Sequence, residues 1–107
     1  MVARQGFCVA FTGEHVSRIR DWAEELFREV TRQRWGTVED IDRSTDRVWV
    51  VAASKRVTGD LAKAILRTLR HSHLLDVATV RKLRSDVDWQ EYDAFLVSRG
   101  RPTKRCS

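Results

Sequence analysis

Few residue patterns in this chain could bind a metal or a phosphate group. His71-Ser72-His73 contains the one histidine pair, and an H-x-H pair on a strand can chelate a metal ion. Here the pair ends a helical segment, where the helix dipole favours a cation, and no further ligands are evident. Thr12-Gly13-Glu14-His15 joins a strand to a helix, but it lacks a glycine-rich phosphate loop and Glu14 would repel an anion. We therefore predict no metal and no cofactor.

The cysteines and the clustered aspartates do not form a recognisable catalytic site either. Cys8 lies in an apolar run that should be buried, Cys106 lies in the polar C-terminal segment, and their separation matches no metal-binding spacing. Asp40, Asp42 and Asp46 lack the glycine and the late glutamate of a calcium loop, so we interpret them as part of a hairpin turn. No Ser/His/Asp or Cys/His arrangement for nucleophilic catalysis is apparent. A binding protein is therefore favoured over an enzyme.

One set of residues could contact phosphate groups because it clusters positive charge. Its members occupy one helix, the strand region that follows it and the C-terminal segment: they are Lys63, Arg67, Arg70, Arg81, Lys82, Arg84, Arg99, Arg101, Lys104 and Arg105. A solvated helix face with a solubilising tail would show the same pattern. The net charge of +5 is local, because residues 99–107 carry four basic and no acidic side chains and the rest of the chain carries only +1.

A second set could form an apolar interface. The two strongest predicted strands, 7–12 and 47–53, are apolar on both alternating faces, whereas a half-solvated antiparallel sheet should be polar on its outer face. We expect a third helix or a second subunit to cover that face. The interface residues would be Cys8, Ala10, Trp49, Val51, Ala53, Trp89, Tyr92 and Phe95. Two further tryptophans, Trp22 and Trp35, lie at or beyond the margin of the first helix's apolar stripe.

The elements that must position these residues begin with two amphipathic helices. In the segment 58–70, Leu61, Ile65 and Leu69 recur every four residues and should face the core. The apolar stripe of the segment 16–30 consists of Val16, Ile19, Ala23, Leu26, Phe27 and Val30.

Capping signals predict where the helices begin and end. Thr12 is expected to cap the start of the first helix, and Gly36 is expected to end it in the left-handed conformation. Thr58-Gly59-Asp60 should cap the second helix. Ser85-Asp86-Val87-Asp88 resembles the capped start of a third helix, which would end before Gly100.

Four segments have the apolar, branched content of strands: 7–12, 37–42, 47–53 and 76–83. The order strand–helix–strand–strand–helix–strand predicts a ferredoxin-like α+β sandwich, βαββαβ, with a C-terminal helix added. Its four-stranded antiparallel sheet would carry the two amphipathic helices on one face. The expected core cluster comprises Val9, Leu26, Phe27, Val50, Ile65 and Leu69.

The predicted fold also occurs among RNA-binding domains, whose sheets carry aromatic side chains on the first and third strands. Phe7, Phe11 and Trp49 occupy those strands here. The ribonucleoprotein motif itself is absent, and we interpret the two phenylalanines as core residues.

Length and composition predict one domain over residues 1–98 and a basic, disordered tail over 99–107. No apolar run approaches the roughly 20 residues that span a bilayer, and no secretory signal is evident, so we expect a cytoplasmic protein without membrane contact. The first functional hypothesis is a non-catalytic binding or assembly module that forms a homodimer or binds a protein partner through the outer sheet face. The alternative is nucleic-acid binding, of RNA in particular, through the basic helix face and tail. A small enzyme ranks third.

Overall fold

The computed structural model describes residues 4–39 and 47–98, and this part of the chain contains four strands and three α-helices. Their order is β1 (Gly6–Phe11), α1 (Val16–Gln33), β2 (Gly36–Glu39), β3 (Arg47–Ala52), α2 (Thr58–His71), β4 (Ala78–Lys82) and α3 (Asp86–Ser98). Short 3₁₀ turns at Lys55–Val57 and Leu75–Val77 precede α2 and β4. The expected hairpin turn at 43–46, with Asp40, Asp42 and Asp46, and the tail 99–107 with Cys106 lie outside the described residues.

The strands form one sheet in the order β2-β3-β1-β4, and every neighbouring pair is antiparallel. Because β1 and β2 are both antiparallel to β3, they run parallel to each other with β3 between them. The strands β3 and β4 are likewise parallel with β1 between them. The helices α1 and α2 therefore each connect two parallel strands across an intervening one. The predicted α+β class with a four-stranded antiparallel sheet is confirmed.

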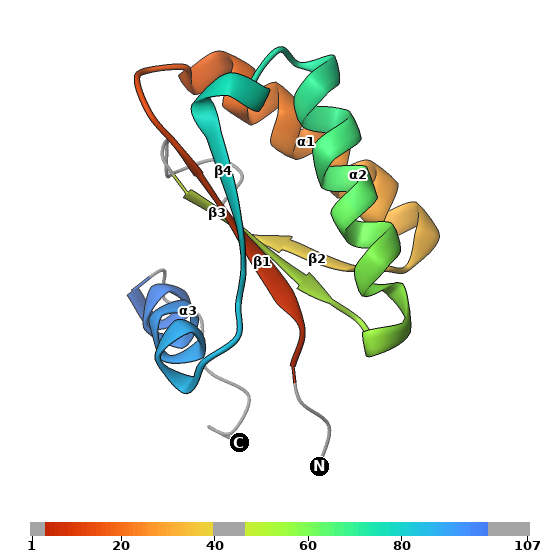
Figure 1. Cartoon of the computed structure of the whole chain (residues 1–107), viewed down its shortest axis with the longest axis vertical. Coiled ribbons are helices and arrows are strands. Elements are labelled where there is room, and N and C mark those ends of the chain that lie inside the picture. The colour runs from red at the N-terminus through yellow and green to blue at the C-terminus, as the bar shows by residue number, and fades with distance from the viewer. Residues whose placement is uncertain (1–3, 40–46, 99–107) are drawn as a thin grey trace.

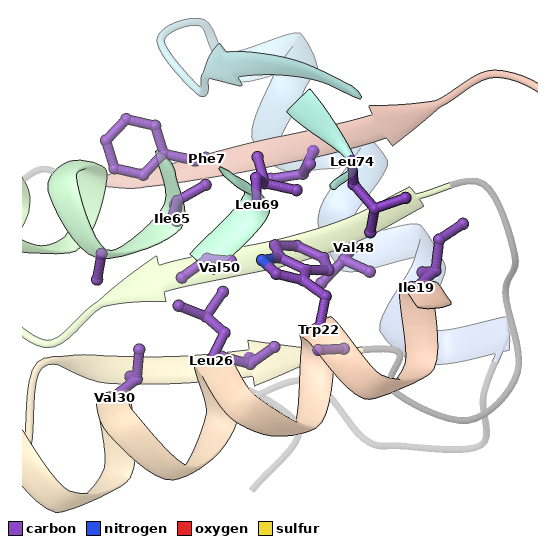
Figure 2. Packing of buried hydrophobic residues seen from close by; sticks show 14 of the residues in the cluster. Phe7, Ile19, Trp22, Leu26, Val30, Val48, Val50, Ile65, Leu69 and Leu74 are labelled. Carbon is purple, nitrogen blue, oxygen red and sulfur yellow. The ribbon is translucent and has the colours of Figure 1, made fainter. Parts of the chain in front are cut away.

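The helices lie in two layers on opposite sides of the sheet (Figure 1). One face is covered by α1 and α2, as predicted, and α3 lies against the other, which we call the outer face. The main core fills the space between the sheet and α1/α2, where Val9, Leu26, Val50, Ile65 and Leu69 are fully buried. Figure 2 shows four of them, Leu26, Val50, Ile65 and Leu69, packed together. Five of the six residues expected in the core are thus confirmed.

The apolar stripe of α1 differs from the predicted one. Phe27 and Val16 were expected in the core, but they are 42% and 41% exposed. Trp22, expected at the margin, is fully buried and projects from α1 towards α2 and the sheet (Figure 2). Phe27 follows Trp22 by five positions, which places their side chains about 140° apart around the helix axis. Burying Trp22 therefore turns Phe27 towards solvent.

The predicted caps at both ends of the first helix are wrong. The first helix begins at Val16 after His15, and not after Thr12. It ends at Gln33, and the next residue, Arg34, caps it with a left-handed φ of 59° and a backbone N–H that donates to the Thr31 carbonyl at 3.2 Å. Gly36 instead opens β2, where a Cβ atom would collide with the Val51 carbonyl oxygen of the neighbouring strand. Close approach of two strands, and not a helix end, explains this glycine.

The start of α2 also differs from the prediction, whereas the start of α3 agrees with it. Val57 precedes α2 without a side-chain cap, and Thr58 is the first helical residue; its buried Oγ1 has no hydrogen-bond partner among the described residues. At α3 the Asp88 N–H donates to Ser85 Oγ at 3.2 Å, and the Ser85 N–H donates to Asp88 Oδ2 at 3.2 Å. This reciprocal pair is a capping box in which aspartate replaces the usual glutamate.

Candidate functional site

The outer face of the sheet carries two rows of side chains across β3, β1 and β4. In one row Cys8 lies between Trp49 and Arg81, and in the next Ala10 lies between Arg47 and Thr79. The first row is largely covered by α3, whereas Arg47, Thr79 and Arg81 are exposed and Ala10 is half-buried. In these two rows the uncovered part is therefore Ala10, flanked by polar and cationic residues.

Aromatic packing holds α3 against the first row. Trp89 and Tyr92 of α3 form a second buried cluster with Cys8, Trp49 and Leu83. The Trp49 ring centroid lies 4.4 Å from that of Phe95. The third helix of the same chain thus covers the part of the outer face around Cys8 and Trp49, whereas Ala10, Val51 and Ala53 stay partly or fully accessible.

Ion pairs between three arginines and three carboxylates of α3 add to this contact. Arg4 donates two hydrogen bonds to Asp93, at 3.1 and 3.2 Å, and its guanidinium lies 4.3 Å from the centre of the Trp89 ring. In β4, the Arg81 Nη1 donates to Asp88 Oδ1 at 2.7 Å. Because the arginines are about half exposed, each pair contributes only about 0–1 kcal/mol.

A third carboxylate, that of Glu91, lies between two arginines from different strands. One of its oxygens is 3.7 Å from Arg47 Nη1 and the other is 4.0 Å from Arg81 Nη2. Both separations exceed the length of a hydrogen bond, and the Glu91 side chain is about half exposed. Glu91 is therefore held much less firmly than Asp88.

A hollow of about 230 Å³ opens where these groups meet. It is lined by Cys8, Ala10, Arg47, Thr79, Arg81 and Glu91. Burial raises the pKa of the Cys8 thiol, and the nearby Arg81 and Arg47 guanidiniums oppose this shift only in part. A thiol with a raised pKa is protonated at neutral pH and is a poor nucleophile, so the charged groups at this hollow are the two guanidiniums and the Glu91 carboxylate.

The basic residues singled out from the sequence do not form one surface. Lys63, Arg67 and Arg70 lie on the exposed side of α2, where Arg67 pairs with Glu29 of α1 at 3.4 Å. Arg81 and Arg84 border α3 on the opposite side of the sheet. Lys82 is exposed at the end of β4, opposite Phe7 of β1. The four basic residues of the tail, Arg99, Arg101, Lys104 and Arg105, lie outside the described residues.

The residues expected at an apolar interface divide between the interior and the surface. Cys8, Trp49, Trp89 and Tyr92 are buried within the single chain. The others remain accessible to different extents: Ala10, Val51 and Phe95 are half-buried and Ala53 is exposed. Of the aromatic residues expected on the first and third strands, only Trp49 faces outward, since Phe7 and Phe11 belong to the main core.

The histidines make local contacts. The Nδ1 atom of His71 lies 3.3 Å from a carboxylate oxygen of Glu25, and the His73 carbonyl accepts a hydrogen bond from Arg18 at 3.2 Å. His15 lines a shallow hollow at the start of α1, where its Nδ1 is 2.9 Å from Arg18 Nη2. Within 4–39 and 47–98, no group of three or more His, Cys, Asp or Glu side chains is placed to hold a metal ion.

Sequence reasoning missed the part played by Arg4, Arg47, Glu91 and Asp93. The sequence does indicate that this helix needs cationic partners, because residues 85–98 carry four acidic and no basic side chains. Pairing those acids with particular arginines requires the strand register.

None of the helices in the described ranges is long and apolar enough to cross a membrane. Comparison with family models and with curated proteins finds no match to the chain.

Proposed function

We propose that this protein is a non-catalytic module that binds single-stranded RNA through the exposed side of α2. The supporting observation is the row of Lys63, Arg67 and Arg70, which project from the side of α2 opposite its buried stripe. The row spans about 10 Å along the helix axis, long enough to follow a phosphate backbone over more than one nucleotide.

The rigidity of this row supports the proposal. Leu61, Ile65 and Leu69, on the other side of α2, are fully buried in the main core, so the helix backbone that carries the cations is held in place. Binding to a preformed surface loses less conformational entropy than binding that must order it. Arg67 of the row pairs with Glu29 at 3.4 Å, and because the Arg67 side chain is 59% exposed, this ion pair is weak enough to exchange for a phosphate.

The experiment compares two double variants of equal charge by fluorescence anisotropy with a labelled 12-nucleotide oligouridylate. K63Q/R70Q removes two cations from the row, and R20Q/R28Q removes two exposed cations from α1. We expect K63Q/R70Q to weaken binding and to make the slope of log K against log salt shallower by about 1.4, since each phosphate contact on a single strand contributes about 0.7. Equal losses in both variants would show that net charge alone matters and would overturn the proposal.

Self-association is the second candidate function. It is supported by an apolar margin beside α3, where Val51, Phe95 and Leu96 stay only partly buried in the single chain. Val51→Glu would place a charge in the apolar contact between two copies of the chain, where water is excluded. Light scattering should then find a monomer in place of a dimer, and the circular dichroism spectrum should stay unchanged. A wild-type protein that is monomeric at high concentration would contradict this function.

We further propose that the fold is the ferredoxin-like sandwich. This assignment is supported by the strand order β2-β3-β1-β4 and by the two interleaved crossovers through α1 and α2.

A further inference from the structure

We infer that the hollow between Arg47 and Arg81 on the outer sheet face is a second binding site for a phosphate of the same RNA, and that Glu91 occupies the position of that phosphate in the free protein. The inference rests on the proposed function, because the ligand is the same. It adds a site on the outer face, where the hollow lies, and Figure 1 shows α2 on the other side of the sheet.

The first argument is the geometry of the two guanidiniums. Arg47 comes from β3 and Arg81 from β4, and the strand between them contributes only Ala10 and the buried Cys8 to the floor of the hollow. Both arginines approach one carboxylate, that of Glu91, through different oxygens. Two arginines around one anionic group are an arrangement that also suits a phosphate, which accepts hydrogen bonds from guanidinium groups on several oxygens.

The second argument is the contrast between Glu91 and Asp88. Asp88 accepts hydrogen bonds from the backbone N–H groups of Arg84 and Ser85 and from the Arg81 side chain, at 2.7 to 3.2 Å. It is therefore fixed in place and holds Arg81 over the hollow. Glu91 has longer contacts and an exposed side chain, so it can turn towards solvent and make room for a phosphate between the two guanidiniums.

The third argument concerns the size and polarity of the site. The volume of about 230 Å³ and the Thr79 side chain on its wall suit a small polar group. The neighbouring Trp49 ring is packed against Phe95 of α3 and is not available for stacking on a base. The site is therefore expected to contact the backbone without reading the sequence of the RNA.

The test uses the full chain and the labelled 12-nucleotide oligouridylate in the anisotropy assay, with Glu91→Gln as the informative variant. Removing the competing carboxylate should tighten binding about fivefold, the equivalent of one exposed ion pair. Glu24→Gln removes the same charge from the exposed side of α1 and should change the affinity less than twofold. Equal tightening by E91Q and E24Q would overturn the inference.

Removal of Arg47 provides the second half of the test. R47Q should weaken binding about fivefold, whereas R20Q, with the same loss of charge on α1, should have less than half that effect. In the R47Q background E91Q should tighten binding less than the fivefold expected in the wild type, because the carboxylate competes with the phosphate for Arg47. A full E91Q effect without Arg47 would contradict the competition.

A variant that changes no charge keeps the test independent of electrostatics. Ala10→Leu would extend a side chain into the hollow and should weaken binding, while circular dichroism confirms that the sheet is intact. If K63Q/R70Q weakens binding but E91Q, R47Q and A10L leave it unchanged, the proposed function stands and this inference is wrong. If the wild-type protein does not bind the oligouridylate, both are wrong.

Discussion

Thr68 of α2 connects two helices through one hydroxyl group. Its Oγ1 accepts a hydrogen bond from the Trp22 indole at 2.8 Å and donates one to the Ala64 carbonyl at 2.7 Å, and both side chains are buried. Thr68→Val keeps the shape but leaves the indole N–H without a partner. We expect a loss of about 1–3 kcal/mol in the free energy of unfolding, measured by urea denaturation.

The control for this variant is Thr31→Val, which changes an exposed threonine of α1. It should alter the free energy of unfolding by no more than about 0.5 kcal/mol. If T68V and T31V were equally stable, the buried hydrogen bond would not contribute to the packing of α1 against α2.

The Asp88 carboxyl should make the stability of α3 depend on pH. Hydrogen bonds from the Arg84 backbone, the Arg81 side chain and the Ser85 backbone hold its pKa well below the ordinary value of 3.8. A group whose pKa is lowered on folding stabilises the folded state above its unfolded pKa, and this contribution is lost as pH falls towards the folded value. The stability advantage of the wild type over Asp88→Asn should therefore be full at pH 6 and shrink below about pH 4.

Urea denaturation followed by tryptophan fluorescence, at pH 6 and at pH 2.5, measures that difference, because Trp89 and Trp49 report on α3. Glu24→Asn is the control, since Glu24 is exposed on α1. A difference between wild type and D88N that stays constant from pH 6 to 2.5 would contradict the role given to the capping box.

At the scale of the element, α2 has two sides with opposite tolerance to substitution. Ile65 is fully buried, whereas its neighbour Leu66 is 47% exposed. Ile65→Ala should lower the free energy of unfolding by about 2–5 kcal/mol through lost burial and the cavity left behind. Leu66→Ala should cost less than about 1 kcal/mol, and thermal or urea denaturation of the pair compares them directly. Equal costs would mean that the orientation of α2 is wrong.

Most elements could be predicted from the sequence because their signals are local. The four-residue spacing of Leu61, Ile65 and Leu69 determines the buried side of α2 without knowledge of its neighbours. Serine and aspartate at the start of α3 form the predicted capping box for the same reason. The strand alternation also placed Trp49 and Cys8 on the outer face.

The errors arose where tertiary contacts override local preference. Trp22 lies on the buried side of α1 because its indole N–H donates a hydrogen bond to Thr68 of another helix. No residue near Trp22 in the sequence indicates that partner. Gly36 was mistaken for a helix cap because its role is to permit close approach to β3. Of the candidate site, the aromatic cover could be predicted, but the arginine pairs with α3 depend on the register that brings β3 and β4 to either side of β1.

At the scale of the whole molecule, charge is divided between the two layers. The α2 row points away from the sheet into solvent on one side of the molecule, while acids of α3 pair with Arg4, Arg47 and Arg81 on the other side. Apart from residues 99–107 the chain has a net charge of only +1, so those residues supply most of the long-range attraction for an anionic polymer.

Neutralising the four cations in that segment should therefore slow association with RNA. The variant R99Q/R101Q/K104Q/R105Q keeps the chain length and lowers the net charge from +5 to +1. We expect a lower association rate at low salt in stopped-flow fluorescence, and a binding slope against log salt that is shallower by up to about 2.8 if each cation meets one phosphate. At high salt the rates of variant and wild type should converge, because screening removes the long-range term. Association that is equally fast at low salt would show that the RNA is attracted by the α2 row alone.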